Sequence, residues 1–214
     1  MFHQFNNNLA APKYWIDLDE GRKKISGKQE DKGQKLSYQD YRLVHRRIAR
    51  NTDQRSLIAC ILPKNRFCAD TAQTVKNILP YKVTIYIATL FNSFVNDYQI
   101  RHRITAHCDM HFMCSLKIPR LKEGDKYFQE IVENAAKLIC TTEEFDQLAK
   151  EVGIGSHKNG VTEEAERMAI RAKLDAIIAH LYELTLTEFQ HILTTFPLVP
   201  ESVKTATLKA YQNL

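Results

Sequence analysis

Hydrophobic positions alternate with polar ones in the front half of the chain and recur at helical spacing in the rear half. In the front half, residues 41–48 and 56–62 predict two strands joined by a turn that contains Asn51 and Asp53. The second segment, SLIACIL, is a continuous apolar run ended by Pro63. Such a run is typical of a strand that is buried on both faces.

The next segments predict a further strand between two helices. Residues 70–79 favour a short helix that Asp70 caps. The alternation in KVTIYIA predicts a strand over residues 82–88. Over residues 90–104 the spacing becomes helical, with apolar side chains on one face at Phe91, Phe94, Val95 and Tyr98.

Behind residue 121 the chain predicts helices that pack on one another. Helical spacing covers residues 126–139 and resumes after Thr162, with GIGSHKNG at 153–160 as a connecting loop. Two capping boxes predict further helix starts, at Thr141 with Glu144 and at Thr185 with Glu188. The predicted fold class is therefore α+β, with a mixed β-sheet over residues 38–121 and a helical region over 122–214.

The net charge changes sign at the same boundary, between residues 121 and 122. Residues 1–121 carry 20 Lys and Arg against 10 Asp and Glu, whereas residues 122–214 carry 10 against 15. The net charges of +10 and −5 add to the +5 of the whole chain. A basic front half favours a polyanionic partner, and an acidic rear half favours a scaffold. We predict a basic α/β domain over 1–121 and a helical region over 122–214.

The N-terminal segment has its own pattern. Residues 20–37 carry six cations against three anions and almost no large apolar side chains, which predicts a flexible loop. Residues 1–19 instead combine polar with aromatic side chains. Burial is predicted there for Phe2, Phe5, Tyr14, Trp15 and Ile16.

Nothing in the sequence predicts export or a membrane partner. The N-terminus lacks a signal-peptide pattern, and the apolar runs are far shorter than a membrane span. The five cysteines are odd in number and scattered, which favours reduced thiols over a disulfide framework. We predict a cytoplasmic protein.

One group of residues has the composition of a metal site. His107, Cys108, His111 and Cys114 supply four potential metal ligands within eight residues. The same stretch alternates apolar and polar positions, which predicts a strand over residues 107–118. On a strand the two cysteines and the two histidines face opposite sides, so we predict no metal site.

Motifs for common catalytic sites are missing. The sequence contains no G-x-S-x-G elbow, no phosphate-binding G-x-x-x-x-G-K-[ST] loop and no G-x-G-x-x-G fingerprint. We therefore predict that the chain is not an enzyme on its own. Methyl transfer from labelled S-adenosylmethionine by the purified chain would contradict this prediction.

The stretch YRLVHRRIARNTDQRSLIACILP concentrates arginines around the predicted turn. Guanidinium groups can bind phosphate or guanine in bidentate fashion, and amide side chains can read base edges. The candidate contacts are Arg42, Arg46, Arg47, Arg50 and Arg55, with Asn51, Asp53 and Gln54 as candidate base readers. Composition alone supports a solvated strand edge equally well, because charges there prevent pairing between sheets.

Four segments, in this order, resemble the C-terminal part of adenine-specific DNA methyltransferases. They are Tyr41–Pro63, TIYIATLFNSFVNDYQIRHR at 84–103, SLKIPRL at 115–121 and Arg171–Val199. The methyltransferases are those of type II restriction–modification systems in which methylase and nuclease share one chain, and related phage-defence methylases. The opening MFHQFNNN…PKYWI is similar to the point where the specificity region of that family begins.

The resemblance implies a target-recognition domain with a helical C-terminal support. In that family an upstream domain binds S-adenosylmethionine and flips out an adenine for N6 methylation, while this region reads the DNA sequence. The positions that match the family's motifs are Arg42, Arg46, Thr52, Asp53, Arg55, Pro63, Asn92, Ser93, Tyr98, Pro119, Asp175, Leu181, Tyr182, Phe196 and Pro197. Several have an expected structural role: Asn92 and Ser93 begin a helix, Pro119 ends a strand, and Asp175 and Tyr182 connect helices.

The sequence departs from that family in its catalytic motifs. The tetrapeptide Asn/Asp-Pro-Pro-Tyr/Phe, the glycine-containing cofactor motif and a nuclease pattern are all missing from the chain. The predicted partners are therefore double-stranded DNA and the N-terminal methyltransferase domain of a parent protein, where S-adenosylmethionine would bind. Further candidate DNA contacts are Lys64, Asn65, Arg66, Arg101 and Arg103.

A second function remains open at this point. The acidic helical region over 122–214 is also typical of an interaction module that docks a separate methylase or nuclease subunit. A DNA affinity that falls steeply with added salt would favour DNA recognition over the docking function, because the steepness of the fall reflects the number of phosphate contacts.

Overall fold

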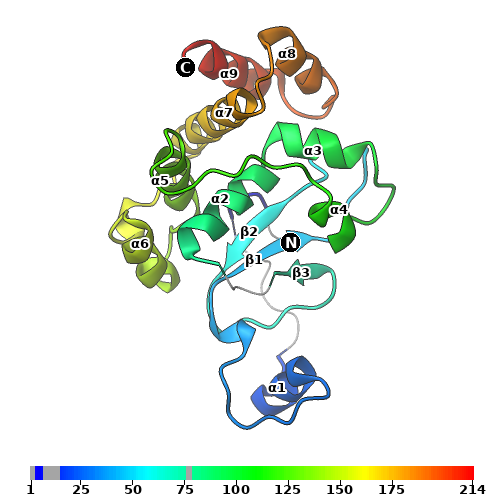
Figure 1. Cartoon of the computed structure of the whole chain (residues 1–214), viewed down its shortest axis with the longest axis vertical. Coiled ribbons are helices and arrows are strands. Elements are labelled where there is room, and N and C mark those ends of the chain that lie inside the picture. The colour runs from blue at the N-terminus through cyan, green and yellow to red at the C-terminus, as the bar shows by residue number, and fades with distance from the viewer. Residues whose placement is uncertain (1–2, 7–14, 76–78) are drawn as a thin grey trace.

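The computed structural model describes residues 3–6, 15–75 and 79–214 and has a small sheet followed by helices (Figure 1). The strands are β1 (Arg42–Arg46), β2 (Ala59–Leu62) and β3 (Ala72–Thr74), in the order β2-β1-β3. This arrangement confirms the α+β class. Both strand pairings are antiparallel, so the sheet is antiparallel throughout the described residues rather than mixed.

The predicted hairpin of two strands is confirmed. Leu43 of β1 lies opposite Ile61 of β2, and Val44 lies opposite Cys60. Apolar side chains on one face of the hairpin join the main core, and those on the other face form a small cluster of Val44, Ile58, Cys60 and Leu62. The continuous apolar run is therefore buried on both faces, as its composition predicts.

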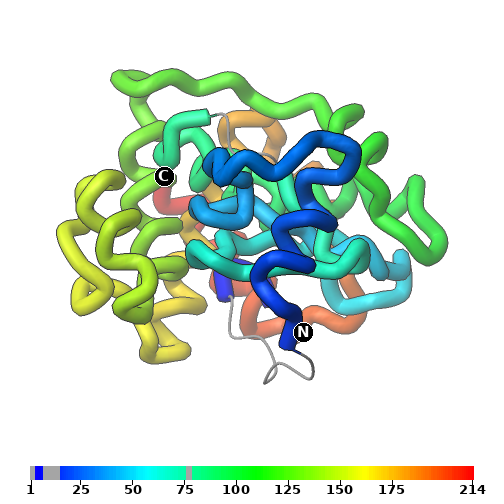
Figure 2. Tube along the Cα trace, turned by 90° about the horizontal axis from the view of Figure 1, so that it is seen from below, coloured from blue at the N-terminus to red at the C-terminus, as the bar shows by residue number. Residues whose placement is uncertain are grey.

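Nine α-helices are described. They are α1 (Leu18–Ser26), α2 (Tyr81–Phe91), α3 (Phe94–Arg101), α4 (Met110–Cys114), α5 (Phe128–Ile139), α6 (Asp146–Val152), α7 (Glu164–Leu181), α8 (Leu186–Thr194) and α9 (Glu201–Gln212). In the view from below, α1 lies nearest the viewer, α5 and α6 lie on the left, and the green segment around α4 lies on the right (Figure 2). None of these helices is long and apolar enough to cross a membrane.

The strand predicted over residues 82–88 is wrong, because this segment lies in α2. Seven of the helix's eleven residues are buried, including Thr84, Ile85 and Tyr86 in succession. A helix buried around most of its circumference has no polar face, so its apolar pattern cannot distinguish it from a strand. The hydroxyl of Thr89 is satisfied within the helix, donating to the Ile85 carbonyl at 2.8 Å.

The helix predicted over residues 90–104 is two helices. α2 ends at Phe91, and the Ser93 side chain caps α3 by accepting from the Asn96 amide at 3.2 Å. This confirms the expected helix start at Asn92 and Ser93. Two further segments differ from prediction. Residues 72–74 of the predicted 70–79 helix form strand β3, and residues 76–78 lie outside the described residues.

The predicted loop over residues 20–37 is wrong for residues 20–26, which lie in α1, whereas residues 27–36 form neither helix nor strand. Asp17 caps α1 by accepting from the amides of Asp19 and Glu20, at 2.9 and 3.1 Å. Arg22 then donates from Nε and Nη2 to the two carboxylate oxygens of Asp31, both at 2.7 Å. The charges that suggested disorder therefore form a helix cap and a bidentate ion pair, which fix the segment locally.

The aromatic N-terminal segment is only partly buried. Phe5 lies in the core, whereas Trp15 and Ile16 are 88% and 59% exposed, contrary to prediction. Phe2 and Tyr14 lie outside the described residues.

The rear helices form mostly as predicted, although two of the predicted caps shift. Thr185 and Glu188 make the predicted capping box at the start of α8. Glu163, not Thr162, caps α7, and the box predicted at Thr141 and Glu144 is replaced by a 3₁₀ turn over Glu143–Phe145. One hydrophobic cluster includes Leu43 of the sheet and Leu174 of α7, so the core continues across the change of charge at residues 121–122.

Gly160 ends the 153–160 connection, which contains a 3₁₀ turn over His157–Asn159. A Cβ at this position would collide with the carbonyl oxygen of Cys140 and lie 2.9 Å from that of His157. Because both are backbone atoms, the contact cannot be relieved by a side-chain rotation.

Gly160→Ala is therefore expected to lower the free energy of unfolding by more than about 2 kcal/mol. Thermal or urea unfolding measures the change. Lys158→Ala, an exposed position in the same connection, is the control. Equal stability of the two variants would contradict this packing of the connection against α5.

Candidate nucleic-acid interface

The connection between β1 and β2 carries an exposed tip, residues 50–54, which we call the 50–54 turn. The Asp53 carboxylate accepts from the Arg50 amide at 3.1 Å and from Arg46 Nη2 at 3.2 Å. A side chain that accepts from the backbone three residues earlier closes the turn locally. Asp53 is thus engaged in shaping the turn, although the sequence suggested it as a base reader.

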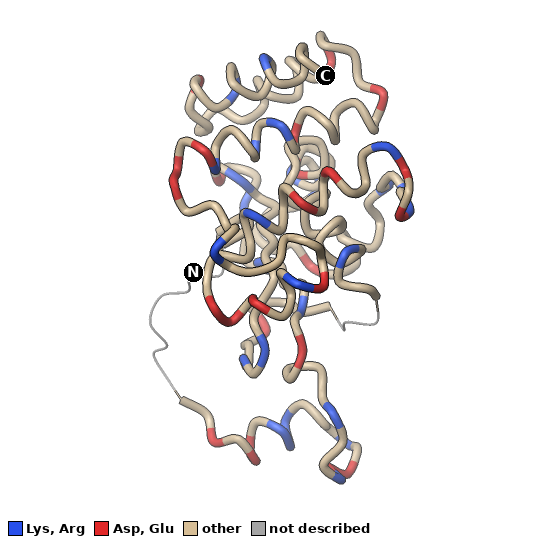
Figure 3. The backbone as a smooth tube through the Cα atoms, turned by 90° about the vertical axis from the view of Figure 1, so that its left-hand side faces the viewer, with Lys and Arg blue, Asp and Glu red and all other residues tan. Residues whose placement is uncertain are grey.

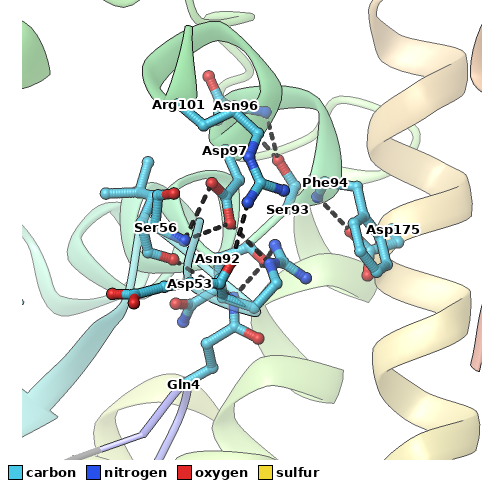
Figure 4. Close-up of polar contacts among 12 residues, drawn as sticks. Gln4, Asp53, Ser56, Asn92, Ser93, Phe94, Asn96, Asp97, Arg101 and Asp175 are labelled. Atoms are coloured by element: carbon cyan, nitrogen blue, oxygen red, sulfur yellow. Dashed lines mark hydrogen bonds and ion pairs between the residues drawn. The ribbon is translucent and has the colours of Figure 1, made fainter. Parts of the chain in front are cut away.

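Arg101, the last residue of α3, lies next to the turn and holds its backbone (Figure 4). Its side chain donates from Nη2 to the carbonyls of Asn51 and Asp53, both at 2.8 Å. The residue is 4% exposed, and its guanidinium lies 4.1 Å from the ring centroid of Phe196. Burial lowers the pKa of Arg101, but arginine stays charged in any case. Arg101 therefore holds the turn's backbone and is not available to DNA.

A second buried ion pair fixes the end of the turn. Arg55 Nε donates to Asp97 Oδ2 at 2.7 Å, and its Nη2 donates to the Asn92 carbonyl at 2.6 Å. The Asp97 side chain is fully buried and also accepts from the Ser56 amide. Burial raises the pKa of Asp97, and the charges of Arg55 and Arg101 oppose that shift. Arg55 is therefore a structural residue as well.

Asn92 and Asp175 complete this network (Figure 4). The Asn92 amide pairs with both backbone groups of Ala59, accepting from its N–H and donating to its carbonyl at 2.9 Å each. Asp175 of α7 accepts from the Phe94 amide at 2.8 Å and so caps α3. Burial raises the pKa of Asp175 to about 6. The expected role of Asp175 in connecting helices is confirmed.

Tyr182 also connects the rear helices to the front half of the chain, since its hydroxyl oxygen lies 3.0 Å from Asn96 Oδ1 and 2.7 Å from the Lys117 carbonyl oxygen, either of which can accept its proton. Pro119 does not end a strand; its carbonyl accepts from the Tyr86 hydroxyl at 3.0 Å.

The predicted contact residues do not form one patch. Arg42 and Leu62 lie at the end of the hairpin opposite the 50–54 turn, so Lys64 and Arg66 lie there too. Arg42 is buried and donates to the Arg66 carbonyl, Arg66 pairs with Glu144, and Lys64 donates to Gln147 at 2.7 Å. Asn65 is exposed in the same turn.

At the end of the hairpin near the 50–54 turn, Arg47 forms ion pairs with Asp70 at 2.9 Å and with Asp109 at 2.7 Å. Lys and Arg alternate with Asp and Glu along much of the backbone (Figure 3), which matches this pairing. The exposed side chains of Arg50, Asn51, Thr52 and Gln54 make no hydrogen bond or ion pair with any described residue.

The segment after α3 lies beside this turn, which the sequence did not indicate. Ile48 bridges to His107, and the Ala49 amide donates to the Ala106 carbonyl at 3.2 Å. Three exposed basic residues therefore flank the turn, namely His102, Arg103 and His107. Only the separation of these segments along the chain hid their proximity.

The strand predicted over residues 107–118 is wrong, because residues 110–114 form α4. Cys108 is buried, with its thiol 3.5 Å from the Met113 sulfur, and Cys114 is exposed. Among the described residues, no group of three or more His, Cys, Asp or Glu side chains has the spacing to hold a metal ion.

Comparison of the chain with protein-family models, with curated proteins and with solved structures gave no match.

Arg101→Ala is expected to lower the free energy of unfolding by about 2–4 kcal/mol, because it leaves the carbonyls of Asn51 and Asp53 without their buried donor and removes one of the two cations near Asp97. Faster proteolysis within the 50–54 turn should accompany the loss. Arg103→Ala is the control, since its side chain is exposed and expected to change stability by under about 0.5 kcal/mol. Equal effects of the two variants would contradict the supporting role of Arg101.

Asp175 predicts a pH dependence. Its folded-state pKa is about 6, above the ordinary value of 3.8, so the folded state binds the proton more tightly than the unfolded state. The charged carboxylate therefore destabilises the fold above pH 6, and this penalty disappears as the pH falls toward 3.8.

Asp175→Asn keeps an acceptor for the Phe94 amide and removes the penalty. The variant is expected to exceed the wild type in stability at pH 7.5 by up to about 3 kcal/mol, with the difference vanishing near pH 4. Urea unfolding across this range tests it. A difference that does not change with pH would show that folding leaves the pKa of Asp175 unchanged.

Proposed function

We propose that this chain binds duplex DNA in a sequence-dependent manner through the 50–54 turn. The observation that carries the proposal is the contrast between the turn's backbone and its side chains. The backbone is held by Arg101 and Asp53, whereas Arg50, Asn51 and Gln54 extend from it with no partner among the described residues. A rigid support with uncommitted polar side chains is what base readout requires.

The chemistry of these side chains suits the major groove. Arginine can donate two hydrogen bonds to guanine O6 and N7, and asparagine or glutamine can pair with adenine N6 and N7. Arg50, Asn51 and Gln54 would take these roles. The flanking basic residues His102, Arg103 and His107 would contact phosphates and set the register of the turn on the duplex.

The motif resemblance suggests the larger context. We propose that the chain is the target-recognition region of an adenine-specific restriction–modification methyltransferase. The motif positions Arg55, Asn92 and Asp175 all belong to the internal network, which supports a shared structural design. S-adenosylmethionine would bind to an upstream catalytic domain, and no methyl-transfer step is assigned to residues of this chain.

A random duplex library tests the proposal at low and moderate salt. Binding should fall steeply with salt, and the bound pool should be enriched in one sequence. Arg50→Ala with Gln54→Ala is expected to weaken binding at least about tenfold and to change the enriched sequence, at about 1–3 kcal/mol for each lost base contact. Stability should change by less than about 0.5 kcal/mol, because neither side chain makes a hydrogen bond or ion pair with the described residues.

Arg66→Ala is the matched control, since Arg66 is an exposed arginine at the opposite end of the hairpin and its ion pair with Glu144 lies at the surface. Arg46 and Arg47 are unsuitable for this test, because their ion pairs belong to the fold. Binding that ignores Arg50 and Gln54 would disprove the role of the turn. An absence of DNA binding would instead favour a module that docks a protein subunit through the acidic helical region.

A further inference from the structure

A cleft of about 720 Å³ lies beside the 50–54 turn, between it and helices α7 and α9. Arg50 and Arg55 line it on the side of the turn, Met168 and Arg171 on the side of α7, and Val203 on the side of α9. Its volume falls in the range of about 300–1,000 Å³ that is usual for sites of small organic ligands. The duplex itself is far too large to enter.

The polar lining of the cleft favours an anion. Four arginines border it against three carboxylates, Asp53, Glu164 and Asp175. Arg50 is exposed, and its side chain makes no hydrogen bond or ion pair with the described residues. On the opposite wall, Arg171 pairs with Glu164 of the same helix, α7. α9 begins on the edge of the cleft at Pro200, without a side-chain cap.

The remaining lining is apolar and open. Ile58, Phe94, Ala172 and Val203 contribute to it, and Met168 is 37% exposed although its side chain is hydrophobic. A flat apolar group placed here would cover surface that is otherwise left to water. Guanidinium planes add stacking surfaces, because arginine stacks on nucleobases as well as binding phosphate.

We propose that this cleft binds a nucleotide unit, with the base against the wall formed by Met168 and Val203 and the phosphate at Arg50 and Arg171. The residues of α7 and α9 take no part in the duplex contact proposed above, so the two sites can be tested separately. The unit is either a free nucleotide or an unpaired nucleotide of a DNA strand that lies on the 50–54 turn.

Titration of the full chain with each of the four deoxynucleoside monophosphates, followed by calorimetry, measures binding of the free unit. Affinity for a duplex with one unpaired nucleotide, compared with the fully paired duplex, measures binding of the strand unit. The proposal requires saturable binding of a nucleotide in the first experiment, or tighter binding of the duplex with one unpaired nucleotide than of the fully paired duplex in the second. Failure of both would overturn it.

Met168→Glu places a negative charge in the cleft at a partly exposed position. It is expected to weaken nucleotide binding at least about tenfold. Ala169→Glu is the matched control, because it adds the same charge to the next, exposed position of α7, which does not line the cleft. Equal weakening by both substitutions would assign the effect to overall charge and overturn the site.

Val203→Trp is a second variant that fills the cleft without changing charge, and its unfolding temperature shows whether it folds. Loss of nucleotide binding with unchanged affinity for the fully paired duplex would support the cleft. Nucleotide binding that survives in folded Val203→Trp would overturn it. Arg50 belongs to both sites, so the two functions are separated by Met168→Glu and Val203→Trp, which change only the α7 and α9 walls of the cleft.

Discussion

The ion pair between Arg55 and the fully buried carboxylate of Asp97 is the interaction on which the rest of the interface depends. It joins the sheet hairpin to α3, and the Ser56 amide and the Asn92 carbonyl complete its hydrogen bonds. Two charges taken out of water are tolerated only when their remaining donors and acceptors are also satisfied. Removing one partner from such a pair costs about 3–5 kcal/mol, because the other charge stays buried.

The same network unites the sheet with the helices behind it. Asp175 caps α3 from α7. At the opposite end of the hairpin a separate bond also connects the front half of the chain to the rear half, because the hydroxyl of Tyr41, which precedes β1, donates to the Glu144 carbonyl at 2.7 Å. Hydrophobic packing continues beneath these bonds without a break at residues 121–122. The change from basic to acidic composition therefore describes the surface, and the core does not follow it.

Sequence patterns predicted the fold where local chemistry decides the structure. The both-face burial of SLIACIL, the amphipathic α5 and the Thr185–Glu188 cap all form as their residues indicate. Prediction failed where tertiary packing decides. α2 is buried on most sides, so its sequence does not show the polar face that marks an amphipathic helix. α1 depends on its Asp17 cap and on the Arg22–Asp31 ion pair, which composition does not reveal.

The same limit applied to the interface. The arginine-rich stretch was recognisable, but composition could not separate the buried Arg42 and Arg101 from the exposed Arg50. That distinction depends on partners such as the Asn51 carbonyl, fifty positions away from Arg101 along the chain. Proximity of His107 to the turn depends likewise on a β-bridge between distant segments.

The separation of supporting residues from tip residues also bears on how such a surface can change. Substitutions at Arg50, Asn51, Thr52 and Gln54 remove no side-chain hydrogen bond or ion pair with the described residues, so they use little of the narrow stability margin of a folded domain. Substitutions at Arg55, Asp97 or Arg101 remove buried ion pairs or hydrogen bonds and therefore reduce that stability margin strongly. New tip sequences can therefore accumulate by mutation on an unchanged scaffold, which makes the 50–54 turn an evolvable and engineerable element.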